Sequence, residues 1–321
     1  MGPRPAAACA ALWLAAAGIG AGEGPSWRVW ANPIDDAQIG LYEALAADAT
    51  HPLSVIAVTG LREGQALAPI AGGLLGVASE PERSAFAQLT RDSARKRTHV
   101  MVFLDALHWE LSTSDQLDVL NQRPDLLEVN YGSTCGSAVG AGRYVSPCHP
   151  AVKAALTELA GRIPEIAPAP PGLIVRCRLS PTEILGYSEA QRLAYVRAAA
   201  IDPIDLLPVT GDAVDKTCLE AWSRWRLGAL TELLTLVAAA FRGEAPSGTV
   251  TAAVLAGAYR EPVAKRTCAA EDWLTWILDD IIDGVLLEGA WEEGSEDRDY
   301  ASALGIIAKT GKEIEIGVML R

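Results

Sequence analysis

The sequence predicts an α/β protein with a barrel of the (β/α)8, or TIM-barrel, type, and three observations support this prediction. Short apolar runs rich in β-branched residues alternate with helical stretches along the 321 residues. The runs are apolar at nearly every position, as is typical of parallel strands covered on both faces. The phosphate-binding patterns GxGxxG and GxxxxGK[ST] are absent from the sequence. A series of such units favours a closed barrel over an open, doubly wound sheet.

Strands are expected at seven places along the chain. In order they are Trp27 to Ala31, Leu53 to Thr59, His99 to Asp105, Leu173 to Cys177, Thr249 to Ala256, Gly284 to Glu288 and Glu313 to Leu320. An eighth strand is not recognised, although an open barrel would leave strand edges that proteins usually cover. Three alternatives follow: the barrel closes with seven strands, another segment fills the gap, or the chain is truncated.

Helices are expected between these strands, where apolar residues recur with helical spacing. Their expected ranges are 35–47, 79–97, 114–121, 150–162, 188–200, 217–242, 270–280 and 299–309. Ser79 would cap the second helix, because a serine side chain accepts a hydrogen bond from the first turn. Residues 122–149 break the alternation, and we expect an irregular excursion or a hairpin there.

Residues 1–24 have the pattern of a secretory signal peptide. Arg4 gives a positive start, an apolar run extends from Ala6 to Ala17, and small residues follow up to Ala21. The run is too short to remain as a membrane-spanning helix, and no later segment is long and apolar enough for one. The alternative for the run is a buried N-terminal helix. We therefore expect a secreted or periplasmic protein with one domain over residues 25–321 and no integral membrane segment after cleavage.

The charge and the cysteines limit the partners of the protein. The net charge of −13 argues against nucleic acid or an anionic membrane, because both favour basic surfaces. It suits a neutral or cationic ligand, or an acidic surface that serves solubility alone. Cys135 and Cys148 flank a Gly-rich segment, and their spacing permits a local disulfide without demanding one. No Cys/His spacing resembles a zinc site, and we expect neither a metal nor another cofactor.

Four segments carry a resemblance to a known family. They are FAQLTRDSARKRTHVMVFLDALHW (86–109), YVSPCHPAVKAALTELAGRI (144–163), PGLIVRCRLSP (171–181), and ILGYSEAQRLAYVRAAAIDPIDL followed by WSRWRLGALTELL (184–206 and 222–234). In this order and spacing they resemble the bacterial glycosyl hydrolase-like family 10 barrels, over about residues 27–320. The resemblance implies a TIM barrel that acts on or binds a carbohydrate.

The fourth strand departs from the pattern of that family, DGIHLDYxRYP. Arg176 stands where the pattern has an acid, Pro171 replaces its first aspartate, and Leu179 and Ser180 replace its later Arg-Tyr pair. Glycoside hydrolysis needs a carboxylic acid and a second carboxylate on opposite sides of the scissile bond. A permanent cation at one of these positions prevents proton transfer there and reverses the local field. The resemblance therefore implies an altered catalytic site.

Candidate catalytic residues are carboxylates at the C-terminal ends of the strands, where barrel enzymes carry their sites. Glu288 ends the strand GVLLE, Asp105 ends the third strand, and Glu183 follows the fourth. The sequence leaves a structural alternative open for two of them. Glu288 could pair with Arg176 across the mouth of the barrel, and Asp105 could cap the turn that follows it.

Candidate substrate-binding residues follow the same strand ends. They are Asn32, His108, Trp109, Arg176, Arg178, Tyr259 and Trp291. Aromatic rings stack on the apolar faces of sugars, which is the role expected of Trp109 and Trp291. His108 could donate a hydrogen bond to a sugar hydroxyl or could serve packing alone.

Three functions are compatible with these residues. The first is an exported glycoside hydrolase that uses Glu288 with Asp105 or Glu183, and the second is a non-catalytic carbohydrate-binding protein. The third is a structural protein of the bacterial envelope without a small ligand. Two mouth carboxylates about 5–10 Å apart would keep hydrolysis open. An ion pair between Glu288 and Arg176 with no second acid nearby would favour binding.

Overall fold

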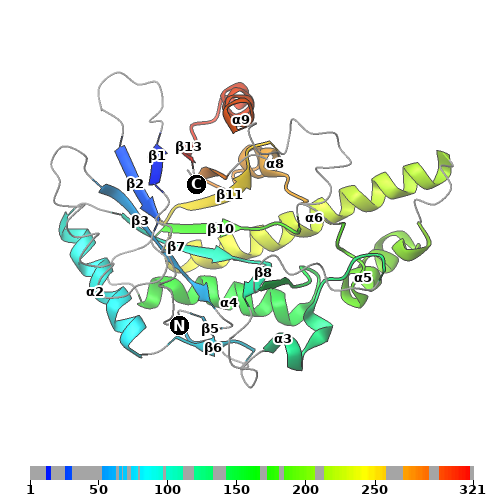
Figure 1. The fold of residues 1–321 in the computed structure, drawn as a ribbon, viewed down its shortest axis with the longest axis horizontal. Helices are drawn as coiled ribbons and strands as arrows, with labels where there is room; N and C mark the ends of the chain where they lie inside the picture. The colour runs from blue at the N-terminus through cyan, green and yellow to red at the C-terminus, as the bar shows by residue number, and fades with distance from the viewer. Residues whose placement is uncertain are drawn as a thin grey trace, which may run out of the picture.

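The fold is taken from a computed structural model of the chain (Figure 1). The described residues are 12–15, 26–30, 53–62, 65–66, 68–70, 74–78, 80–96, 99–110, 119–132, 142–166, 172–180, 184–206, 213–257, 270–288 and 296–318. The expected helix over 35–47 and the proposed cap Ser79 lie outside them.

One eight-stranded sheet forms the centre of the molecule, in the order β1-β2-β3-β7-β10-β11-β12-β13. From β2 onward every neighbouring pair is parallel, and the strands follow one another in chain order. These seven are β2 (Ser26–Trp30), β3 (Leu53–Thr59), β7 (His99–Asp105), β10 (Gly172–Arg176), β11 (Val250–Leu255), β12 (Gly284–Glu288) and β13 (Glu315–Val318). All seven predicted strands are confirmed, within three residues at each end.

The remaining strand of the sheet is β1 (Leu12–Ala15), which pairs antiparallel with β2. It also lies against β13, at the opposite end of the strand order (Figure 1). Of the three alternatives for the missing strand, the filling of the gap by another segment is the one the structure takes. A buried helix over Leu12–Ala15, the alternative to a signal peptide, is wrong because these residues are extended. Removal of residues 1–24 remains a prediction, and it would also remove β1.

Helices cover the outer face of the sheet, most of them at the predicted places. They are α2 (Glu80–Lys96), α3 (Val119–Gln122), α4 (Pro150–Ile166), α5 (Glu189–Ala199), α6 (Ala213–Glu244), α8 (Trp273–Leu278) and α9 (Glu296–Thr310). Ser188 caps α5 by accepting a hydrogen bond from the amide of Gln191. The helices α4 and α6 lie side by side, and α6 extends well beyond the sheet to the region of α5 (Figure 1).

The strand side chains divide into two buried groups because successive residues point to opposite faces of a strand. One group, which includes Val102, Leu104 and Val175, packs in the large core under the helices. The other is a separate cluster of Met101, Phe103, Ile174, Ala253 and Leu286, which fills the inner face of the sheet. The next positions with the same alternation are Asp105, Arg176 and Glu288. The strand period therefore places these three charges directly above the apolar inner layer.

The excursion predicted over 122–149 contains a short pairing of its own. Strand β8 (His108–Glu110) pairs antiparallel with β9 (Gly142–Tyr144), and a 3-10 turn, η1 (Pro124–Leu126), lies between them in the chain. A small sheet of β4 (Leu61–Arg62), β5 (Gln65–Ala66) and β6 (Gly76–Val77) was not predicted.

Of the predicted disulfide partners, Cys148 is a free thiol and Cys135 lies outside the described residues. Within the described part of the chain, no helix combines the length and apolarity that crossing a bilayer requires.

Asp283 joins three elements at the lower end of the sheet. Its carboxylate accepts hydrogen bonds from the amide of Val250 and from Arg242 of α6, each at 2.8 Å. Asp283→Ala should lower the free energy of unfolding by about 1–3 kcal/mol, because the Val250 amide loses its partner. Urea denaturation would measure the change. Asp280→Ala, which removes a partner of Lys312 at an exposed position, should cost less than about 1 kcal/mol, and an equal loss in both variants would contradict the role of Asp283.

Candidate functional site

The C-terminal ends of three parallel strands bring Asp105, Arg176 and Glu288 together, as the sequence predicted. In the sheet Arg176 is directly opposite Asp105, and Glu288 is opposite Leu255 of β11. Backbone bonds continue past the strand ends: the amide of Ala106 donates to Arg176 O at 2.9 Å, and that of Ala256 donates to Glu288 O at 3.2 Å. The three side chains are therefore positioned by the rigid sheet.

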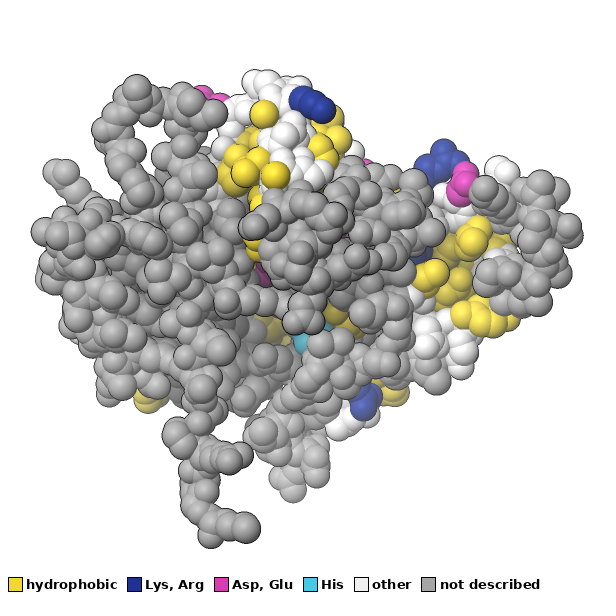
Figure 2. Space-filling view, turned by 45° about the horizontal axis from the view of Figure 1, so that its top comes forward, with side chains coloured by type: hydrophobic (Ala, Val, Ile, Leu, Met, Phe, Trp, Pro, Cys, Tyr) yellow, Lys and Arg dark blue, Asp and Glu magenta, His cyan; other side chains and the backbone are white. Residues whose placement is uncertain are grey.

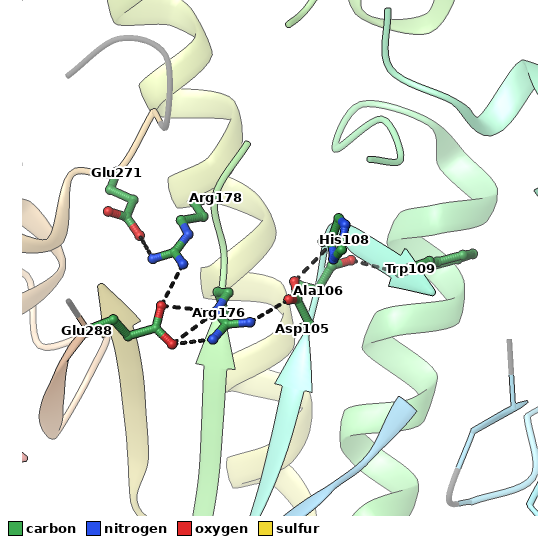
Figure 3. A network of polar contacts seen from close by, with 8 residues as sticks. All are labelled: Asp105, Ala106, His108, Trp109, Arg176, Arg178, Glu271 and Glu288. Carbon is green, nitrogen blue, oxygen red and sulfur yellow. Dashed lines mark hydrogen bonds and ion pairs between the residues drawn. The ribbon is translucent and has the colours of Figure 1, made fainter. Parts of the chain in front are cut away.

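The guanidinium of Arg176 lies between the two carboxylates and bonds to both (Figure 3). Its Nη1 donates to Asp105 Oδ2 at 2.8 Å, while its Nε lies 3.1 Å from each oxygen of Glu288 and its Nη2 donates to Glu288 Oε1. Below it, the ring of Phe103 lies 4.8 Å from the Arg176 Cζ atom, within cation–π range. A half-buried cation with this many partners is a fixed part of the site.

A second arginine extends the network away from Asp105. Arg178, two residues beyond Arg176, places its Nη2 2.6 Å from Glu288 Oε2 and its Nη1 3.5 Å from Glu271 Oε1 (Figure 3). The other oxygen of Glu271 accepts a hydrogen bond from the amide of Leu255 at 3.0 Å. Glu271 and Glu288 thus share one guanidinium, and each has a further fixed partner.

The two glutamates have pKa values that move in opposite directions. Burial by itself would raise the pKa of Glu288, but the nearby Arg178 and Arg176 outweigh it and lower this pKa from 4.5 to about 2. Burial raises the pKa of Glu271 from 4.5 to about 7, because its contact with Arg178 is long and the charge of Glu288 opposes ionisation. At neutral pH Glu288 is therefore ionised, whereas Glu271 is close to half-protonated.

Sequence reasoning missed Glu271, the carboxyl group whose pKa is raised. It comes after the fifth strand but before α8, so neither a strand end nor a motif marks it. Its hydrogen bond from the Leu255 amide and its ion pair with Arg178 tie it to the barrel mouth. The neighbouring acids Glu271 and Asp272 do not predict a functional site either, because such pairs are common at solvated helix starts.

His108 lies beside the network on β8, as expected for a mouth residue. Its backbone amide donates to Asp105 Oδ1 at 3.1 Å, so Asp105 also stabilises the turn that follows β7. Its ring lies 5.0 Å from that of Tyr144 on β9. Within the described part of the molecule, the buried Nε2 atom of His108 has no hydrogen-bond partner. A buried nitrogen without a partner costs free energy, so a hydrogen-bonding group that reached it would stabilise the site.

Trp109 does not have the exposed position that sugar stacking requires. Its side chain is 1% exposed, and its Nε1 donates to Ala106 O at 3.0 Å. Its ring packs in the main apolar core and points away from the Arg176 network (Figure 3). The expected role of Trp109 as a stacking surface is corrected to that of a core residue.

The other predicted site residues are not covered by the structure. Asn32, Glu183, Tyr259 and Trp291 all lie outside the described residues. Their proposed roles in catalysis and binding stay predictions. Among the described residues, no group of three or more His, Cys, Asp or Glu side chains is arranged to hold a metal ion.

Several solved structures resemble this fold. A β-galactosidase from the Antarctic haloarchaeon Halorubrum lacusprofundi superposes with a TM-score of 0.57 at 15% identity, covering 82% of this chain and 39% of that enzyme. The β-galactosidase of the psychrophilic Marinomonas ef1 gives 0.56 at 11% identity, with 82% and 40% covered. A GH42 β-galactosidase from G. stearothermophilus gives 0.53 at 14% identity, with 87% and 42% covered. No protein-family model matches the sequence, and no curated protein matches it significantly.

These likenesses establish the fold. The chain has the glycoside hydrolase-like TIM-barrel architecture that the sequence predicted, and it spans about two-fifths of the length of these enzymes. They do not single out the family 10-like proteins among the barrels of this type.

The raised pKa of Glu271 makes stability depend on pH. Folding favours the protonated form of Glu271. The stability that this protonation contributes is fully present below about pH 4.5 and is lost as the pH rises through about 7. Relative to Glu271→Gln, the wild type should lose up to about 3 kcal/mol of unfolding free energy between these limits, at about 1.4 kcal/mol per pKa unit. Denaturant titrations across this range would measure it, with the exposed Glu232→Gln as the control. A constant difference would contradict the assignment.

The position of Arg176 between two carboxylates predicts a large cost for its removal. Arg176→Met should destabilise the fold by about 3 kcal/mol, because Asp105 and Glu288 lose a buried counter-charge. Arg192→Met removes a pair with Asp202 that is more exposed, and it should cost about 1 kcal/mol or less. Thermal unfolding of both variants would make the comparison. Equal losses would show that the mouth network is no more important to stability than a surface ion pair.

Proposed function

We propose that this chain is an exported carbohydrate-binding protein, related to the family 10-like glycosylhydrolases, whose mouth does not hydrolyse glycosidic bonds. One observation carries the proposal: a single guanidinium, that of Arg176, occupies the space between Asp105 and Glu288 and bonds to both. In a glycosidase this is the space that the scissile bond and the attacking group would need. The barrel and its glycoside hydrolase-like neighbours support a sugar as the ligand.

The electrostatics of the mouth also support binding over hydrolysis. Glu288 is buried and held ionised by two arginines, so it cannot supply a proton near neutral pH. Its negative charge is already satisfied, which weakens it as a nucleophile. Asp105 is engaged on both oxygens, by Arg176 and by the amide of His108. A neutral sugar would meet fixed donors and acceptors here, with the Nε2 atom of His108 among them.

A second candidate is hydrolysis with Glu271 as the proton donor and Glu288 as the base. The opposite shifts of their pKa values favour it, because such a pair divides the acid and base roles. Burial weighs against it, since Glu271 is 1% exposed and Glu288 is 3% exposed. A proton donor must come within hydrogen-bond reach of the leaving oxygen, and neither group does so without displacing Arg178.

Calorimetric titration against a panel of β-galactosides, cello-oligosaccharides, chitin oligosaccharides and maltodextrins would test the proposal. We expect binding to at least one class and no product on chromatography after long incubation. His108→Ala should weaken binding about tenfold, the value of one lost hydrogen bond of about 1.4 kcal/mol. His149→Ala, which changes a histidine paired with Asp125 and not with the Arg176 network, is the control.

Two outcomes would contradict the proposal in different ways. Hydrolysis that disappears in both Glu271→Gln and Glu288→Gln would establish the second candidate. An absence of binding and hydrolysis across the whole panel would reject a carbohydrate function and leave the structural envelope protein as the alternative.

A further inference from the structure

An exposed aromatic residue lies on the loops beyond the barrel mouth, at a position that the proposed function does not use. Tyr131 is 41% exposed, and Ile184 is 43% exposed. The isolated antiparallel bridge between Asn130 and Leu185 brings together the two segments that carry these residues, and Tyr131 begins the turn that follows the bridge. These two exposed side chains on neighbouring segments are here called the Tyr131 platform.

The platform is rigid. The ring of Tyr187 contacts that of Tyr131 edge-on, with centroids 5.6 Å apart at 86°, and Tyr187 itself packs against the buried Trp222. The carbonyl of Val129 accepts hydrogen bonds from the amides of Gly186 and Tyr187, at 3.2 and 3.1 Å. A ring fixed in this way loses little conformational entropy when a ligand stacks on it.

Backbone pairing connects the platform to the barrel mouth. On β8 and β9, His108 is paired with Tyr144, whose carbonyl accepts from the amide of Glu128 at 2.9 Å. Leu127 bridges to Val145, and Asn130 bridges to Leu185. Tyr131 lies three residues beyond Glu128, at the turn that ends this segment. One continuous wall of paired backbone therefore runs from the charged network to the platform.

Gly186 allows this wall to lie close to α6. Its φ of 125° lies in a region that other residues rarely adopt. A Cβ atom there would also come within 2.8 Å of the Arg226 Nε atom. The wall is thus locked against the long helix that projects past the sheet.

Figure 2 shows that hydrophobic side chains also gather over the region of α5 and α6. Leu193 of α5 is 46% exposed there. A stable protein interface needs about 800 Å² on each partner, far more than a tyrosine and an isoleucine provide. One aromatic ring beside a second apolar side chain instead matches a single sugar ring, whose C–H face is apolar.

We propose that the Tyr131 platform is a distal sugar-binding subsite, so that the ligand of this protein is an oligosaccharide or a polysaccharide chain that extends from the mouth. This inference rests on the proposed function. It adds a second contact point to the proposed carbohydrate site, and it sets a minimum length for the ligand. Stacking on Tyr131 would hold a sugar unit remote from the Arg176 network, and short sugars bound at the mouth would not reach it.

The test uses the full chain and calorimetric titration with cellobiose, cellohexaose and the matching disaccharide and hexasaccharide of chitin. The hexasaccharide of the class that binds should bind more tightly than its disaccharide. Tyr131→Ala should lower the hexasaccharide affinity about tenfold and leave the disaccharide affinity unchanged. Tyr131→Phe keeps the ring and should bind within about twofold of the wild type. Leu193→Ala, an exposed apolar residue away from the platform, is the matched control.

The failures of the two proposals are distinguishable. If His108→Ala weakens disaccharide binding but Tyr131→Ala changes neither length, the sugar site stands and the platform is overturned. Equal losses for both lengths in Tyr131→Ala would also overturn it. If Tyr131→Ala instead abolishes self-association on gel filtration with sugar affinity unchanged, the platform contacts a second copy of the chain. If no sugar of either class binds the wild type, the platform falls together with the proposed function for these ligands.

Discussion

The placement of Arg176 over the apolar inner layer is the constraint on which the mouth of this barrel depends. A cation at the end of β10 cannot remain buried without counter-charges, because its desolvation costs several kcal/mol. The strands on either side supply them in register, Asp105 from β7 and Glu288 from β12 beyond β11. Arg178 then balances the additional charge of Glu288 and brings Glu271 into the network. Together the two arginines keep Glu288 ionised, and Arg176 fixes the orientation of both Asp105 and Glu288.

This arrangement makes the mouth well ordered, which fits the proposed role in binding. In a glycosidase the paired carboxylates must stay unequal and accessible, one protonated and one ionised. Here the two glutamates have different pKa values, but both are buried against arginine side chains. What remains exposed to a ligand is a fixed pattern of donors and acceptors, with His108 at its edge. Such a pattern suits recognition, because preorganised groups do not have to be reordered when a ligand binds.

The sequence predicted the parts of the structure that depend on local pattern. Seven apolar runs became seven parallel strands, and the two-residue period correctly placed Asp105, Arg176 and Glu288 on one face. The sequence did not predict the features that depend on tertiary contacts. The indole of Trp109 turns inward to bond with Ala106, which no periodicity shows, and Glu271 joins the network through the Leu255 amide and Arg178, which are distant from it in the sequence. Strand β1 was missed because an alanine-rich apolar run has the composition of an export signal as well as of a strand.

In the chain that keeps residues 1–24, the contact of β1 with both β2 and β13 has a consequence for folding. Each parallel pair from β2 to β13 joins neighbours in the chain order, whereas the contact between β1 and β13 joins segments near its two ends. Closing so long a loop carries the largest entropic cost of any contact in the barrel. The sheet can therefore assemble progressively from consecutive units, and the seam between β1 and β13 forms last. The same proximity makes this seam a natural place to join the ends in a circular permutant, with the new termini opened elsewhere in the barrel.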